Sequence, residues 1–213
     1  DKNELLNDLN FIILPQKSFA SATSQGALAI ECADEASSAL KNNIALLHHT
    51  PTALEMQRER KAFNSYGGGC HLAVGIHVKK VYDFFVHTHK GQADNNEISF
   101  RILEGFDYSH LQGKSVYSVL KENDFLIEKK IIKQQASNAN LFITSLHCKH
   151  NIPPSSSSLW TAGDQTFKSL VQQGFWVNGS AEGYGHGEIQ KLKSSKAISL
   201  MLNNNEWEVL SHS

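Results

Sequence analysis

The chain has 213 residues, 40% of them hydrophobic and 19% charged, with a formal net charge of −1. This length suffices for one large or two small globular domains. The near-zero charge gives no electrostatic basis for binding nucleic acid or an anionic membrane, and no apolar run approaches the roughly 18 residues that span a bilayer. Three widely separated cysteines form no disulfide framework, so we expect a cytoplasmic protein.

The first hundred residues predict a compact α+β unit that closes near Gly105. Residues 25–31 are apolar and β-tolerant, which indicates a strand. Asp34 is a candidate N-cap for a helix that reaches Leu47, and Pro51 opens a second helix that ends at three glycines. Alternating apolar residues then predict a three-stranded antiparallel meander over residues 72–78, 81–89 and 97–103.

The second half has the rhythm of an α/β layer. A helix is predicted over residues 167–173, among strands at residues 141–145, 159–162, 176–177, 198–202 and 207–210. Alternation of strands and helices favours a parallel sheet. The chain begins with Asp1 rather than Met and ends directly after a strand, where such a sheet normally continues into a helix. We therefore expect a piece of a longer protein.

Three consecutive glycines deliver Cys70 at the end of the second helix. Glycine accepts positive φ and has no side chain, so Gly68 and Gly69 leave room for a large ligand beside the thiol. An inert loop thiol is the alternative that the spacing leaves open. A dyad with His71 is not expected, because neighbouring residues on a strand point to opposite faces.

The remaining histidine-rich and glycine-rich stretches indicate no metal or nucleotide site. Residues 147–150 have two histidines and one cysteine but no second cluster, so a solvated loop is expected. His48, His49, His87 and His89 are interpreted as helix-end and strand residues. Residues 183–187 lack the Lys-Ser/Thr and the strand-before, helix-after order of a phosphate loop.

The turn at residues 163–166 is better placed for binding. Its backbone N–H groups open a helix and could receive a carboxylate. An ordinary strand-to-helix turn, with Asp164 near the cap, is the alternative reading.

Several short motifs in the first half occur in an order typical of one enzyme family. They are Ile13-Leu14-Pro15, the run 25–31, Glu59-Arg60, Gly68-Gly69-Cys70 and Val74-Gly75. Together, over roughly residues 5–105, they resemble the C-terminal part of hydroxymethylbilane synthase, also called porphobilinogen deaminase. The resemblance implies a return segment from a preceding domain at residues 1–31, followed by a cofactor-bearing domain of the deaminase C-terminal type at residues 32–105.

In that family the loop cysteine holds a dipyrromethane cofactor through a thioether bond. The resemblance assigns this role to Cys70, with Gln25, Gly68 and Gly69 beside the cofactor, and implies a small pyrrole or tetrapyrrole substrate. The family's catalytic aspartate and its substrate-binding arginines lie in preceding domains, so no catalytic residue is identified in this chain. These missing N-terminal domains are the expected partners.

The sequence also departs from the family pattern at three places. Ser21-Ala22-Thr23-Ser24 replaces Pro-Ala-Val-Gly, Tyr66-Gly67 replaces Leu-Glu, and Ala73 replaces a proline. These changes put full activity of this chain in doubt.

The second half, residues 106–213, resembles uroporphyrinogen-III synthase. The likeness rests on Phe142-Ile143-Thr144-Ser145 and on Ala162-Gly163-Asp164-Gln165-Thr166. It implies that Ser145, Gly163 and Thr166 bind substrate. The sequence thus predicts part of a tetrapyrrole-forming transferase, inactive alone. The alternatives are a non-catalytic scaffold that kept the fold, or a chain with only the uroporphyrinogen-III synthase activity.

Overall fold

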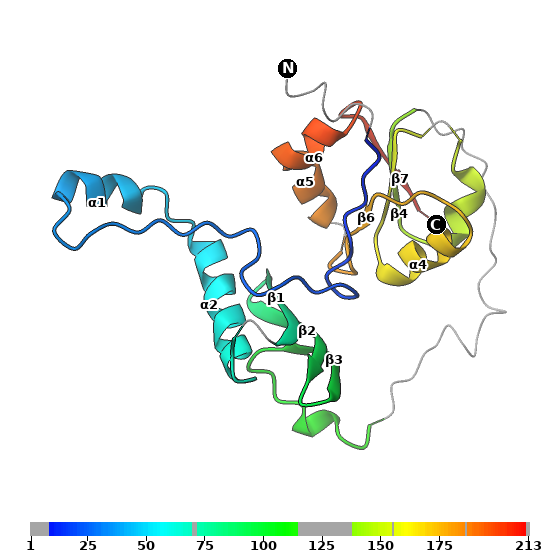
Figure 1. Cartoon of the computed structure of the whole chain (residues 1–213). Coiled ribbons are helices and arrows are strands. Elements are labelled where there is room, and N and C mark those ends of the chain that lie inside the picture. Colours follow the sequence, from blue (N-terminus) through cyan, green and yellow to red (C-terminus); the bar gives the residue numbers. More distant parts are fainter. Residues whose placement is uncertain (1–8, 70–71, 115–137, 155, 186, 212–213) are drawn as a thin grey trace. The chain divides into compact units, whose positions relative to one another are not determined.

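The computed structural model describes residues 9–69, 72–114, 138–154, 156–185 and 187–211 (Figure 1). The chain forms two compact units. The antiparallel unit comprises Ile13–Glu104, and the parallel unit comprises Asp1–Ile12 with Gly105–Ser213. One contains a three-stranded antiparallel sheet and the other a four-stranded parallel sheet. The predicted α+β mixture of these two sheet types is confirmed.

The antiparallel unit consists of two helices and a meander. Its elements are α1 (Ser38–Ala45), α2 (Thr50–Asn64), β1 (Ala73–Val81), β2 (Phe84–Ala93) and β3 (Asn96–Leu103). The N-cap of α1 differs from the prediction, because Ser37 rather than Asp34 caps this helix. Pro51 lies in the first turn of α2, as predicted, and His49 caps this helix, with its Nδ1 2.8 Å from Thr52 Oγ1. His49 is therefore at a helix start, not at a helix end.

The core of this unit lies between α2 and one face of the sheet. Val74, Ile76, Val78 and Ile98 are buried there, and Phe63 from α2 packs against them. The β2–β3 turn has two residues with positive φ, Asp94 and Asn95, which matches the right-handed twist of a two-residue hairpin.

The predicted strand at residues 25–31 is wrong. The segment is non-helical and pairs with no strand among the described residues, and Leu28 is 96% exposed. Apolar β-tolerant residues make a strand possible, but a strand exists only where another backbone offers hydrogen bonds. Helix α1, which follows, has no buried residue.

The parallel unit has its strands in the order β6-β5-β4-β7. They are β4 (Asn140–Ile143), β5 (Ser158–Thr161), β6 (Gly179–Ser180) and β7 (Trp207–Leu210). The helices are α4 (Asp164–Gln172), α5 (Gly187–Ser194) and α6 (Lys196–Met201), with short 3₁₀ turns η1 (Ser109–Leu111) and η3 (Leu146–Asn151).

Both faces of this parallel sheet are covered. On one face Leu141 and Leu159 pack with Leu170 of α4, and on the other Phe142 and Trp160 pack with residues of α5 and α6. Burial on both faces is the usual arrangement of parallel sheets. Phe11 also packs against Trp160, so residues up to Ile12 contribute to this unit.

Two predicted strands of the second half are corrected. Residues 176–177 precede β6 rather than forming a strand, and residues 198–202 fall largely in α6. Short apolar runs do not distinguish a strand from a buried helix. Ile198 and Met201 lie three residues apart and pack into one cluster, as a helix requires. No helix in the described ranges is long and apolar enough to cross a bilayer.

Candidate functional site

Helix α2 runs directly into the glycine loop, residues 67–69. The N–H of Tyr66 bonds to Phe63 O, and that of Gly67 to Asn64 O, which closes the last turn. The three glycines then adopt φ of 95°, 63° and 104°. Only glycine takes three such values at little cost. A Cβ on Gly67 would meet nothing within 4 Å, so conformation rather than crowding requires glycine there.

Cys70 and His71 lie outside the described residues, so the predicted cofactor attachment stays a prediction. The described chain resumes at Leu72, whose N–H donates to Gly69 O at 3.2 Å. Strand β1 begins at the next residue. The loop therefore joins a helix end to a strand start over a short distance.

A buried histidine holds the beginning of the glycine loop. The hydroxyl of Tyr66 lies 2.7 Å from Nδ1 of His89, and the two rings meet edge to face. His89 is 5% exposed, and burial, followed by the nearby His87, lowers its pKa to about 4. Burial also raises the pKa of Tyr66. Both groups are therefore neutral near pH 7, and the contact is a hydrogen bond, not an ion pair.

Sequence reasoning missed this pair because it treated His89 as an ordinary strand residue. Its Nε2 is buried without a hydrogen-bond partner among the described residues, and Phe100 stacks beside the ring at 4.5 Å. The available signal was Tyr66 itself. An aromatic hydroxyl directly before three glycines needs a partner when it is partly buried.

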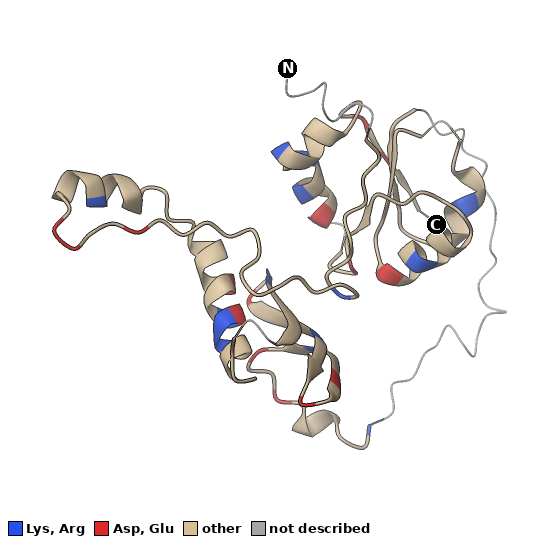
Figure 2. Cartoon of the chain, in the orientation of Figure 1, with Lys and Arg blue, Asp and Glu red and all other residues tan. Residues whose placement is uncertain are grey.

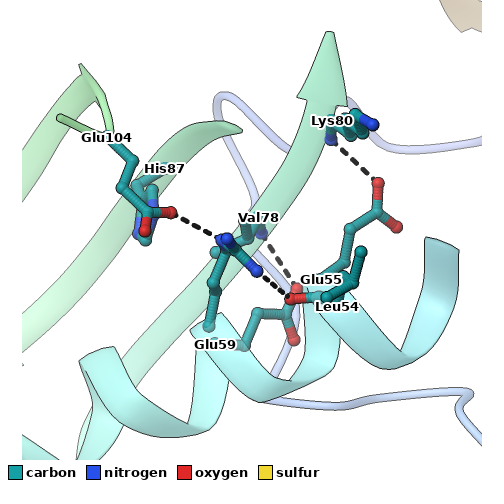
Figure 3. A network of polar contacts seen from close by, with 8 residues as sticks. Leu54, Glu55, Glu59, Val78, Lys80, His87 and Glu104 are labelled. Atoms are coloured by element: carbon teal, nitrogen blue, oxygen red, sulfur yellow. Dashed lines mark hydrogen bonds and ion pairs between the residues drawn. The ribbon is translucent and has the colours of Figure 1, made fainter. Parts of the chain in front are cut away.

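Glu59, from the Glu59-Arg60 motif, is a buried carboxylate with backbone partners. Its side chain accepts the N–H of Val78 at 2.9 Å and of Ser24 at 2.7 Å. One helical turn earlier, Glu55 accepts the N–H of Lys80 at 2.8 Å (Figure 3). The two carboxylates cover the outer edge of β1, which would otherwise present open donors. The motif thus fixes α2, and the loop that follows it, to the sheet.

Basic residues of α2 make further contacts. Arg58 donates from Nε to Glu104 at 2.7 Å and lies over the Phe85 ring, while His87 Nε2 is 3.1 Å from the same carboxylate. Arg60 reaches the Ser24 hydroxyl at 3.2 Å. Figure 2 shows basic and acidic residues side by side along this part of α2. Each of the two arginines has a partner within the unit.

Gln25 is exposed in a turn, where its N–H donates to Ala22 O. Ser24 and Gly26 on either side have positive φ. Within the described residues, Gln25 shares no hydrogen bond with Gly68 or Gly69. Its predicted place beside the cofactor stays a prediction.

An open groove of about 730 Å³ runs along the same unit. Residues 27–30 form one wall, and the end of α1 with the first turns of α2 forms the other. The lining is largely aliphatic, with His48 and Arg60 among its polar members. The groove has the size of a small-molecule site, and it also exposes apolar side chains that a protein surface could cover.

In the parallel unit, the strands end in register. Ile143 lies opposite both Thr161 and Leu210, and Thr161 lies opposite Ser180. The residues that follow these strands therefore emerge at one edge, where open α/β sheets bind ligands. Ser145 and Gly163 are both among them, while Thr166 lies in the first turn of α4.

Two of the three predicted substrate-binding residues are N-caps at this edge, which the carboxyl ends of the strands form. Ser145 is the N-cap of η3, and Gly163 is the N-cap of α4 with no side-chain cap. Asp164 is buried at the start of α4 and lies 3.7 Å from Lys168. A carboxylate at that position already interacts with the helix dipole, which disfavours a second anion. A cavity of about 560 Å³ lies instead before β5 and β6, and Ser145, Gly163 and Thr166 do not line it.

Two other stretches behave differently from the prediction. Residues 147–150 form part of the 3₁₀ turn η3, in which Cys148 is buried and burial raises its pKa. No group of three potential metal ligands occurs in the described part of the chain. The glycine-rich run 183–187 does follow a strand, β6, and leads into a helix, α5. It still lacks the Lys-Ser/Thr of a phosphate loop.

Comparison with known proteins gives one partial similarity. A porphobilinogen deaminase from Synechococcus sp. (strain RCC307) is 37% identical over 67 residues, which cover 32% of this chain and 21% of that relative. No protein-family model matches the chain, and no solved structure matches it. Part of the chain is therefore similar to porphobilinogen deaminase, a transferase of porphyrin biosynthesis. The match spans about a fifth of the relative's length.

Proposed function

We propose that this chain carries the cofactor-bearing part of a hydroxymethylbilane synthase, the transferase that couples four porphobilinogens in tetrapyrrole biosynthesis. The partial similarity to porphobilinogen deaminase carries this proposal. The glycine loop supports it, because three left-handed glycines directly precede the cysteine to which the resemblance assigns the cofactor. The open space beside Gly67 is compatible with a bulky group near the loop.

In this proposal Cys70 holds a dipyrromethane through a thioether. The cofactor supplies the pyrrole carbon onto which porphobilinogen units are added. The chain's own contribution begins with the thiol: it loses its proton, and the thiolate is a soft nucleophile for carbon. The Tyr66–His89 hydrogen bond and the buried Glu59 hold the two ends of the segment that leads to the loop.

The preceding domains of the enzyme are the proposed partners. Deamination needs a general acid to protonate the leaving amine, and the family's carboxylate for this step belongs to those domains. The apolar groove and the exposed Leu28 and Ile30 offer a surface for them to cover. We infer that turnover requires the complete deaminase.

For the parallel unit we propose a uroporphyrinogen-III-synthase-like role, with the tetrapyrrole at the carboxyl edge near Ser145, Gly163 and Thr166. The in-register strand ends favour this edge over others. Conversion of supplied hydroxymethylbilane to the type III isomer, lost in Ser145→Ala, is expected. Formation of the type I isomer only would contradict the role.

Intact mass of the purified chain, joined to the remaining deaminase domains in a host that makes the pigment, tests the main proposal. We expect a dipyrromethane-sized increment and a colour with Ehrlich's reagent. Both should disappear in Cys70→Ala and persist in Cys32→Ala, a matched control because Cys32 is exposed. Unmodified protein would favour a scaffold that kept the fold and lost the reaction.

A further inference from the structure

A cavity of about 560 Å³ lies at the amino edge of the parallel sheet, and its volume is within the range of ligand pockets. Part of its lining comes from residues 152–154 and 156–159, which lead into β5, and part from residues 174–176 and 178, which lead into β6. Asn10 completes the lining. The strands are parallel, so their first residues share one edge and their last residues share the other. This amino-edge cavity is therefore separate from the carboxyl edge described above.

The amino-edge cavity has a neutral polar lining. Among the described residues that line it, none has a charged side chain. The polar side chains are hydroxyls and amides, which both donate and accept hydrogen bonds, and they belong to Asn10, Ser156, Ser157, Ser158 and Asn178. A charged ligand would lose water here without gaining an opposite charge, which costs free energy. The lining therefore favours a neutral ligand.

Two of the lining side chains hold the cavity in shape. Asn178 is 6% exposed, its Oδ1 accepts the N–H of Leu159 at 2.9 Å, and its Nδ2 donates to Phe11 O at 3.0 Å. The hydroxyl of Ser157 accepts from Nδ2 of Asn204 at 2.8 Å. Because these groups are already paired within the unit, the cavity is preformed.

Trp176 supplies an apolar surface to the cavity. It is 55% exposed, and its Nε1 donates to Phe11 O at 3.2 Å, which fixes the orientation of the indole. Among the described aromatic residues, none has its ring packed against that of Trp176. A fixed and exposed aromatic ring at a polar cavity can therefore take the apolar face of a ligand.

Asn10 and Ser156 keep polar groups available for a ligand. Neither side chain makes a hydrogen bond with another residue in the described part of the chain. The N–H of Ser156 bonds to Pro153 O at 3.3 Å, which fixes the backbone that carries the free hydroxyl. The cavity thus combines one fixed aromatic ring with a free amide and a free hydroxyl.

We propose that the amino-edge cavity binds a neutral pyranose sugar, with a C–H face of the ring against Trp176 and hydroxyl groups hydrogen-bonded to Asn10 and Ser156. The axial C–H bonds of a pyranose form an apolar face, and the negative π face of an aromatic ring attracts them. The sugar hydroxyls both donate and accept, like the two free side chains. In a β-glucopyranoside every ring substituent is equatorial, so both faces of the ring are apolar. A sugar of this shape fits the lining best.

A flat aromatic molecule is the alternative ligand for an exposed indole. It would stack on Trp176, but it would bring few hydroxyl groups to Asn10 and Ser156. Polar groups that lose water without gaining a partner reduce affinity. A sugar satisfies both the aromatic and the polar part of the lining, so the hydroxyl-rich ligand is favoured.

The indole N–H signals of the three tryptophans, in an NMR titration of the isotope-labelled full chain, test this proposal. Methyl β-D-glucopyranoside should shift the Trp176 signal with saturation at millimolar concentration, as is typical of a small neutral ligand. The signals of Trp160 and Trp207 should stay in place, because neither residue lines the cavity.

Saturation transfer from the protein to the ring protons of the sugar measures binding in variants as well. Trp176→Leu should abolish the transfer. Asn10→Ala and Ser156→Ala should each weaken binding about fivefold, the usual effect of one lost hydrogen bond. Tyr82→Leu is the matched control, because it removes an exposed aromatic ring from the antiparallel unit, and it should leave binding unchanged.

Glycerol has hydroxyl groups without a ring face, so at the same concentration it should give no saturable shift. A variant counts as folded when its Trp160 and Trp207 signals keep their positions. A sugar-induced shift that is absent, or that rises linearly without saturation, overturns the proposal, and so does undiminished binding by Trp176→Leu. Tighter binding of benzyl alcohol than of the sugar overturns the assignment to a sugar.

Discussion

Replacing Glu59 with alanine should destabilise the antiparallel unit strongly, although the substitution removes only one side chain. Glu59 is 1% exposed, and its carboxylate accepts two backbone N–H groups, from Val78 and Ser24. Without the carboxylate both donors lose their partner, and each such loss costs about 1–3 kcal/mol where water cannot replace it. We expect the free energy of unfolding to fall by about 3 kcal/mol.

The tryptophans make this measurement selective. Trp160, Trp176 and Trp207 all belong to the parallel unit, so their fluorescence follows that unit alone. Hydrogen exchange at the Val78 amide follows the antiparallel unit. A loss of 3 kcal/mol corresponds to exchange about 100-fold faster at that amide. The tryptophan unfolding transition should stay in place, because the hydrogen-bond partners of Glu59 lie in the antiparallel unit.

Glu55→Ala is the matched control, because it removes a carboxylate from the same helix and edge. Its bond to Lys80 is exposed, so water can replace it and the loss should stay below about 1 kcal/mol. Glu59→Gln keeps one acceptor and should be intermediate. Equal effects of Glu59→Ala and Glu55→Ala would refute the argument that burial of the carboxylate sets the cost.

Three further predictions concern single side chains. Gly68→Ala should lower the free energy of unfolding by about 1 kcal/mol, because φ at Gly68 is +63°. Gly163→Ala should lower it less, because Gly163 has no positive φ, and urea unfolding of the two variants tests the difference. The pKa of His89 is lowered, so the free energy of unfolding of the antiparallel unit should fall as the pH drops from 6.5 to about 4 and then level off. Amide hydrogen exchange in this unit measures the change, and His89→Phe should abolish the pH dependence. Asn140→Ala should lower the free energy of unfolding in the tryptophan transition by about 2–3 kcal/mol, since the buried amide donates to Asn204 and Glu206 carbonyls and accepts from Ser158.

Local periodicity predicted most elements of this chain. Both helices before the glycine loop, all three strands of the meander, and strands β4, β5 and β7 were found near the expected residues. These segments carry their signal within a few residues: apolar residues at helical spacing, a proline in the first turn of a helix, or alternation along a strand. The exceptions are residues 25–31, 176–177 and 198–202. They are short apolar runs whose state depends on what lies beside them.

Contacts between distant residues were not predictable in the same way. Nothing local in the sequence says that Tyr66 meets His89, or that Glu59 receives the Ser24 N–H across 35 positions. The motif Glu59-Arg60 was recognised by its spacing, but its physical role is visible only when β1 lies beside α2. For the candidate site, the glycine loop could be predicted from the sequence. The contacts that hold this loop, made by Tyr66 and Glu59, are visible only in the structure.

The distance in sequence between Glu59-Arg60 and the glycine loop has a geometric explanation. Glu55 and Glu59 are four residues apart on a helix, a rise of about 6.0 Å. Lys80 and Val78 are two residues apart on a strand, a rise of about 6.6 Å, and they are met in the opposite order. The two carboxylates can therefore accept from these two N–H groups only if the chain reverses its direction between α2 and β1, over a connection of fixed length. Residues 67–69 provide that reversal, which ties Glu59 to the glycine loop by geometry rather than by contact.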